Sequence, residues 1–130
     1  MRRAKPTGFW RRTDGSAAVE LAFVLPIAIL LTIGAMYLST MMFAAASLHF
    51  AVEDAARCQA VKTSICTNPT TTQTYAQSKY TGPTLAGISF VATNPSCGYQ
   101  VVGSGNYTLK TGLRNISVPL SATACFPKLS

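Results

Sequence analysis

One stretch of this sequence, Leu21 to Leu48, runs for 28 residues without a formal charge. A hydrocarbon core about 30 Å thick is crossed by about 20 helical residues, at about 1.5 Å per residue. The stretch is therefore long enough to span a membrane with residues to spare. The alternative is a helix buried in a soluble core, but a chain of 130 residues has no interior large enough for it. The sequence predicts a single-pass membrane helix.

The basic residues are concentrated ahead of this stretch. Five of them, against Asp14, give the first fifteen residues a net charge of +4 out of +7 for the chain. Lys and Arg beside a membrane span stay in the cytoplasm, so the leader indicates topology. The rest of the chain has no stripe of aromatic and basic residues, and we expect no nucleic-acid partner.

A cleaved secretory signal is the main alternative to an anchor. Residues 1–12 would form its basic region, and Ala44 to Ala46 would offer a small-residue cleavage site. The apolar region of such signals is about 7–15 residues long. The stretch here is about twice that length, which favours an anchor over a domain released after Ala46.

Gly15 and Glu20 stand at the start of the apolar stretch. As an interfacial carboxylate, Glu20 would be favourably placed near a helix N-terminus. If the chain is cut after Gly15, however, Glu20 becomes the fifth residue of the mature protein. A basic leader, a glycine, a glutamate five residues on and a long apolar helix form the type IV prepilin pattern.

Two segments, Gly15 to Pro26 and Leu48 to Arg57, resemble TadE-like pseudopilins, the minor pilin-like proteins of the tight-adherence (Tad, or Flp) pilus. The resemblance covers about residues 15–61. Leu21 departs from the major Flp pilins, which carry tyrosine after the glutamate. That departure, and the long region after the helix, favour the minor class.

The resemblance implies cleavage between Gly15 and Ser16 by a prepilin peptidase. It also implies that Glu20 pairs with the new Ser16 amine of a neighbouring subunit, and that the partners are the membrane, other pilin or pseudopilin subunits and the Tad assembly machinery. The protein would lie in the bacterial inner membrane with its C-terminal domain in the periplasm, either as an assembly factor or as part of the pilus. It would act in surface adhesion without catalysis.

The apolar helix is expected to continue beyond the membrane. Leu48, Val52 and Ala55 recur at helical spacing, and Glu53 precedes Arg57 by four residues, the favourable order for an ion pair. The apolar side could pack on this chain's own domain or on sister subunits. We therefore divide the chain into a cytoplasmic leader (1–15), a long helix (16–62) and a small extracytoplasmic domain (63–130).

The distal region predicts a small antiparallel sheet, and with the long helix an α+β, pilin-like fold. Residues 68–72 are typical of a loop, and 72–80 of a short helix. Strands are expected at 88–93, 99–102, 107–110 and 116–122, with a hairpin turn at 103–106. Pro119 predicts that the last strand lies at an edge or carries a bulge.

Four cysteines, Cys58, Cys66, Cys97 and Cys125, all follow the membrane stretch. An even number outside the cytoplasm predicts two disulfides. Of three possible pairings we favour Cys58–Cys66, which would join the loop to the helix end, and Cys97–Cys125, which would tie the last strand to the sheet. Zinc is less consistent with this sequence, because it has no Cys-x-x-Cys pair.

No constellation for catalysis or cofactor binding is visible. His49 is the only histidine, and all four acidic residues lie in or beside the helix. We therefore expect neither an enzyme nor a metal or cofactor site. The favoured function is that of a minor pseudopilin; the alternative is an unprocessed, membrane-anchored binding or adhesion domain outside the cytoplasm.

Overall fold

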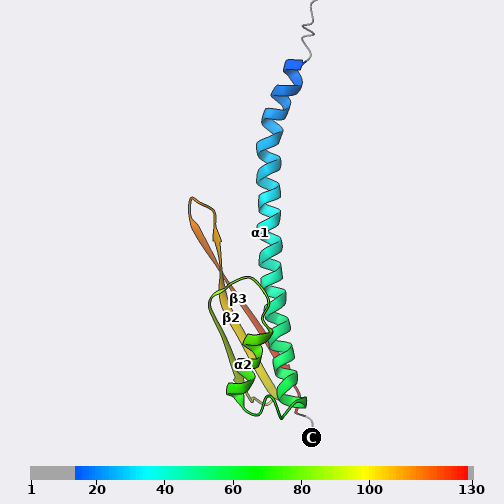
Figure 1. Cartoon of the computed structure of the whole chain (residues 1–130), viewed down its shortest axis with the longest axis vertical. Coiled ribbons are helices and arrows are strands. Elements are labelled where there is room, and N and C mark those ends of the chain that lie inside the picture. Colours follow the sequence, from blue (N-terminus) through cyan, green and yellow to red (C-terminus); the bar gives the residue numbers. More distant parts are fainter. Residues whose placement is uncertain (1–13, 129–130) are drawn as a thin grey trace, which may run out of the picture. The chain divides into compact units, whose positions relative to one another are not determined.

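The computed structural model describes residues 14–128. The leader predicted at 1–15 therefore lies outside the described residues except for its last two. Residues up to Met36 and residues from Tyr37 onward form separate compact units. The elements are, in chain order, α1 (Asp14–Val61), α2 (Pro69–Lys79), β1 (Ala86–Thr93), β2 (Tyr99–Lys110) and β3 (Asn115–Phe126) (Figure 1). The predicted α+β fold, a long apolar helix followed by a small antiparallel sheet, is confirmed.

Helix α1 ends where a disulfide turns the chain back. The Lys62 amide donates the last helical bond to the Cys58 carbonyl, at 2.7 Å, and the Lys62 carbonyl then accepts from the Cys66 amide at 3.0 Å. The Cys58–Cys66 disulfide joins the two ends of this turn. Both cysteines are buried, so the bond fixes the direction in which the chain leaves the helix.

Helix α2 starts three residues earlier than expected. The Asn68 side chain accepts from the Thr71 amide at 2.9 Å, and the Thr71 hydroxyl accepts from the Asn68 amide at 3.1 Å. This reciprocal pair is a capping box, and Pro69 occupies the first helical turn, where its missing N–H costs nothing. The prediction of a loop at 68–72 is therefore wrong, because Asn-Pro here begins a helix.

The three strands form one antiparallel sheet in the order β1-β2-β3. β2 runs unbroken through residues 103–106, so the hairpin turn predicted there is wrong. Gly103 and Gly105 are buried on the inner face of the sheet. A side chain at Gly103 would meet α1, and one at Gly105 would meet Leu85, which precedes β1. Both positions therefore need glycine because of close packing, and the chain does not turn there.

The connection between β2 and β3 lies instead at residues 111–114. Gly112 has a φ of 81°, a conformation that favours glycine. The Thr111 hydroxyl closes the turn by donating to the Arg114 carbonyl at 2.6 Å and accepting from the Arg114 amide at 3.2 Å. Pro119 lies in β3, an edge strand of the sheet, as its sequence position predicted.

The core lies between the C-terminal half of α1 and the inner face of the sheet. Leu48, Val52 and Ala55 on the helix cluster with Phe90 and Val101 on the strands. The apolar side of this part of α1 therefore packs on the chain's own domain. The sequence had left open whether that domain or a sister subunit would cover it. Ala76 of α2 joins the same cluster, so both helices contribute to one small core.

The two disulfides are the pairs favoured from the sequence, Cys58–Cys66 and Cys97–Cys125. The second joins the turn before β2 to the end of β3. It closes a loop with a sequence separation of 28 residues, against 8 for the first. A longer closed loop removes more freedom from the unfolded chain, so this bond is the larger expected contributor to stability.

Candidate functional site

The predicted processing residues, Gly15 and Ser16, and the predicted assembly residue, Glu20, lie in the first two turns of α1. Gly15, Ser16 and Glu20 are all exposed, and nothing lies within 4 Å of where a Cβ on Gly15 would stand. In the described residues Gly15 is already helical. A peptidase that binds extended chain would therefore have to unwind this first turn, a modest requirement because helix ends fray.

The part of α1 that follows Glu20, as far as Thr40, is exposed along its whole length. Every residue from Gly15 to Thr40 is solvent-exposed, although large apolar side chains dominate, with Phe23 at 72% and Leu30 at 70%. Within residues 14–128, α1 is the one helix long and apolar enough to cross a membrane, with a mean hydropathy of 2.4 in its most apolar window. A helix that is apolar on all sides and unburied needs lipid or other helices around it.

Beyond residue 40 the helix has two distinct sides. One side is buried on the domain, as described above. The other carries an outward stripe, which we define as Phe43, Ala46, Phe50, Glu53 and Arg57, at alternating spacings of three and four residues. All five are exposed, including Phe43 at 55% and Phe50 at 59%. This spacing is that of a seam between two packed helices.

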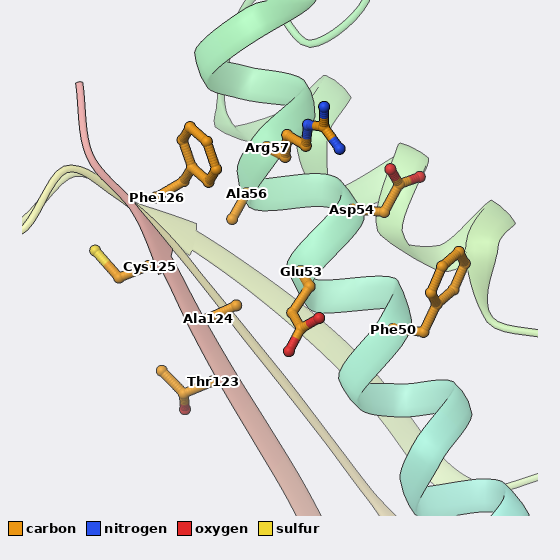
Figure 2. A pocket seen from close by; sticks show the side chains of 9 residues that line it. All are labelled: Phe50, Glu53, Asp54, Ala56, Arg57, Thr123, Ala124, Cys125 and Phe126. Carbon is orange, nitrogen blue, oxygen red and sulfur yellow. The ribbon is translucent and has the colours of Figure 1, made fainter. Parts of the chain in front are cut away.

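A groove runs between the outward stripe and the free edge of β3 (Figure 2). Its volume is about 490 Å³. Its lining combines Phe50, Glu53, Asp54, Ala56 and Arg57 of α1 with Thr123, Ala124, Cys125 and Phe126 of β3. The groove thus presents apolar rings, both signs of charge and the outer edge of a strand.

The charges beside the groove are used in different ways. Asp54 turns toward α2, where it accepts from the Tyr75 hydroxyl at 2.9 Å and lies 3.8 Å from the Lys79 ammonium. The ion pair suggested by the order of Glu53 and Arg57 is not formed in the structure. Glu53 and Arg57 are both exposed and belong to the outward stripe. The domain therefore uses Asp54 for its own packing and leaves the other two charges facing outward.

The described residues show no arrangement suited to binding a metal. No group of three or more His, Cys, Asp and Glu side chains between residues 14 and 128 could hold an ion. His49 lies on the exposed side of α1. The four cysteines are all in disulfides, which removes their thiolates as ligands or nucleophiles.

Sequence reasoning missed one exposed feature, the tip of the β2–β3 hairpin. Leu113 there is 99% exposed, more than any other large apolar residue that the structure describes. Lys110 and Arg114 flank it. The sequence does contain an isolated leucine between glycine and arginine, which is consistent with an exposed turn. Assigning the hairpin turn to residues 103–106 left no turn to expect at this position.

Residues 15–57 match the model of a protein family described as TadE-like protein. This segment of the chain is TadE-like. The match begins at Gly15 and ends at Arg57, so it contains the exposed apolar segment and the whole outward stripe. No curated protein matches the chain, and no solved structure does.

The match confirms the resemblance to TadE-like proteins that the sequence indicated for this segment. It includes Glu20 and the buried side of α1 but stops before α2 and the sheet. The apolar helix, followed by a domain closed by two disulfides, indicates membrane anchoring with that domain outside the cytoplasm.

Proposed function

We propose that the chain is a non-catalytic minor pseudopilin that takes part in assembling a Tad-type pilus for surface adhesion. In this proposal a prepilin peptidase cuts between Gly15 and Ser16 in the bacterial inner membrane. The basic leader remains in the cytoplasm, and the disulfide-bonded domain stands in the periplasm. The observation that supports it best is that the TadE-like segment begins at Gly15 and contains the apolar stretch from Gly15 to Thr40, every residue of which is exposed.

Glu20 is the assembly residue in this proposal. A carboxylate in a membrane helix costs about 2.5–3.5 kcal/mol at the bilayer centre and less near the end. The cut creates an α-amine at Ser16, and pairing Glu20 with that amine on a neighbouring subunit would offset the cost. Glu20 is exposed, so its side chain is accessible to a second helix. One such pair would fix the axial stagger between subunits.

The outward stripe supports lateral association beyond the membrane. Phe43 and Phe50 stay exposed although the domain buries the opposite side of α1. Packing another pilin-like helix against the stripe would cover both rings and bring Glu53 and Arg57 within reach of partner charges. The apolar segment would then leave lipid for a helix bundle when the pilus assembles.

The N-terminus of the mature protein tests the processing step. Edman sequencing or terminal-peptide mass spectrometry of protein from cells with the prepilin peptidase should give Ser16. Protein from cells lacking that peptidase should give Met1. Met1 in both strains would replace the proposal with its alternative, an unprocessed membrane-anchored domain, and Ser47 would indicate a secreted domain.

The variant Glu20→Gln tests the assembly step. We expect it to be processed and inserted normally but to recover fewer pilin subunits in a crosslinked pulldown, because the amide carries no charge to pair with the amine. Lys62→Gln, which removes an exposed charge just beyond the end of α1 and outside the outward stripe, is the control for a general loss of charge. Undiminished recovery with Glu20→Gln would refute the pairing.

A further inference from the structure

The β2–β3 hairpin ends in a small basic and apolar tip, which we define as Lys110, Leu113 and Arg114. Leu113 is 99% exposed, and no acidic residue lies between Tyr99 and the end of the chain. The turn is held by the Thr111 hydroxyl, which bonds to the backbone of Arg114 in both directions. The leucine is therefore presented by a turn with its own internal hydrogen bonds, and no part of the domain covers it.

The tip is held against α1 at one level of the helix. The Tyr37 hydroxyl donates to the Lys110 carbonyl at 3.3 Å. Close by, the Thr40 and Tyr107 hydroxyls are 2.7 Å apart. These two contacts fix the position of the tip along the helix at Tyr37 to Thr40.

That level corresponds to the end of the membrane-spanning segment. Counted along the chain from Leu21, about 20 residues cross the hydrocarbon core, so the crossing ends near Thr40. Tyrosine is enriched at this boundary, where its ring meets the acyl chains and its hydroxyl the headgroups. A hairpin tip held at Tyr37 therefore reaches the membrane surface on the side of the domain.

We propose that the hairpin tip is a lipid-binding site that docks on anionic phospholipids, with Leu113 in the acyl region and Lys110 and Arg114 on the headgroup phosphates. The charge fits an anionic surface, and an exposed leucine between two basic residues fits the boundary between headgroups and acyl chains. Docking would hold the domain at a fixed height and orientation above the membrane. The inference rests on the membrane anchoring in the proposed function and does not depend on cleavage or pilus assembly.

Tryptophan fluorescence in nanodiscs tests the site in the full chain. The sequence has one tryptophan, Trp10, so a Trp10→Phe background leaves Leu113→Trp as the sole emitter. In discs that contain phosphatidylglycerol brominated on its acyl chains, we expect strong quenching of this tryptophan. Ile65→Trp is the matched control, because Ile65 is also an exposed apolar residue in a turn. It follows Lys62 by three residues, as Leu113 follows Lys110, but it lies beyond the C-terminal end of α1.

The charge requirement is tested in the same discs. Each basic residue near an anionic surface strengthens binding about fivefold, so Lys110→Gln with Arg114→Gln should weaken docking of the tip about 25-fold and reduce quenching toward the Ile65→Trp level. Lys62→Gln with Lys128→Gln removes the same charge elsewhere and should leave the quenching unchanged. Discs of brominated phosphatidylcholine should quench less than anionic discs.

Two results would overturn the proposal. If the tryptophan of Leu113→Trp is quenched no more than that of Ile65→Trp, the tip stays in water. Equal quenching in anionic and zwitterionic discs would show that the headgroup charge is not recognised. Neither result bears on processing, because the N-terminus and the pulldown are measured separately. A chain found uncleaved in cells could still dock its hairpin, so the two proposals can fail independently.

Discussion

Gly103 lies in the middle of β2, where Leu48 and Val52 of α1 pack against the sheet. A Cβ added there would stand 2.9 Å from Val52 Cγ1, 2.9 Å from Phe90 Cε1 and 3.0 Å from Leu48 Cδ1. Carbon atoms in good contact are about 3.5–4.0 Å apart. The variant Gly103→Ala must therefore displace side chains on two elements, α1 and β1, by about half an ångström or more.

Two opposing effects set the size of the loss. Extra carbon in a packed core costs about 1–3 kcal/mol in the free energy of unfolding. Replacing glycine by alanine returns about 0.4–1 kcal/mol, because the unfolded chain loses freedom. The net expectation is a loss of about 1.5 kcal/mol. At about 4–8 °C per kcal/mol for a domain of this size, the melting temperature should fall by about 6–12 °C.

Thermal unfolding of the full chain in detergent micelles, followed by near-ultraviolet circular dichroism, measures this loss. Ser104→Ala is the matched control at the next residue, because its side chain lies on the opposite face, 3.1 Å from the Ser89 hydroxyl. That variant should lose less than about 1 kcal/mol. If Gly103→Ala were as stable as the parent, the close approach of α1 to β2 would be refuted, and a turn at residues 103–106 would again be consistent.

Two further predictions concern the domain. Replacing Cys97 and Cys125 by alanine should cost about 3.6 kcal/mol from the loop-closure entropy of the unfolded chain, read as a lower urea midpoint; a loss below about 1 kcal/mol would contradict it. Burial raises the pKa of Tyr80 above its ordinary value of 10.0. The folded state then binds the phenol proton more tightly than the unfolded state does. The resulting contribution to the free energy of unfolding is present below about pH 10 and is lost as the pH rises further. Urea unfolding should show the parent losing stability relative to Tyr80→Phe between about pH 9 and about pH 11, and a constant difference would contradict it.

The sequence was sufficient for the features that depend on composition and order. An uncharged stretch of 28 residues specifies a long helix whatever follows it. The favoured disulfides were also inferable, because Cys58 and Cys66 flank the end of that helix. Pro119 gave the edge strand, since a proline cannot donate to a second neighbour.

Errors arose where one residue type serves two purposes. Gly103 and Gly105 are typical of a turn when judged by local propensity, but here they make room for α1 and for Leu85. That requirement comes from residues distant in the sequence and cannot be seen locally. Asn68-Pro69 has the same ambiguity, since it can end an element or begin a helix, and the choice depends on Thr71 supplying the second half of the capping box.

The candidate site was predictable only in part for a related reason. Gly15 and Glu20 stand out by spacing, whereas the outward stripe appears only after the domain has covered the other side of α1. Leu48, Val52 and Ala55 had marked an apolar side, but the sequence did not say whether the domain or a partner would cover it. The hairpin tip needed both a corrected turn and the Tyr37 contact, neither of which has a local signal.

The charged residues in the C-terminal part of α1 differ in what they contact, and this matters for any test of assembly. Asp54 holds α2 through Tyr75 and Lys79, so changing it would loosen the domain itself. Glu53 and Arg57 are exposed and make no ion pair with each other, and the folded domain does not depend on one. Substitutions in the outward stripe should therefore change association with partner helices while leaving the melting temperature nearly unchanged. A loss of pilin recovery can then be separated from a loss of folding, because the same helix carries both kinds of residue on opposite sides.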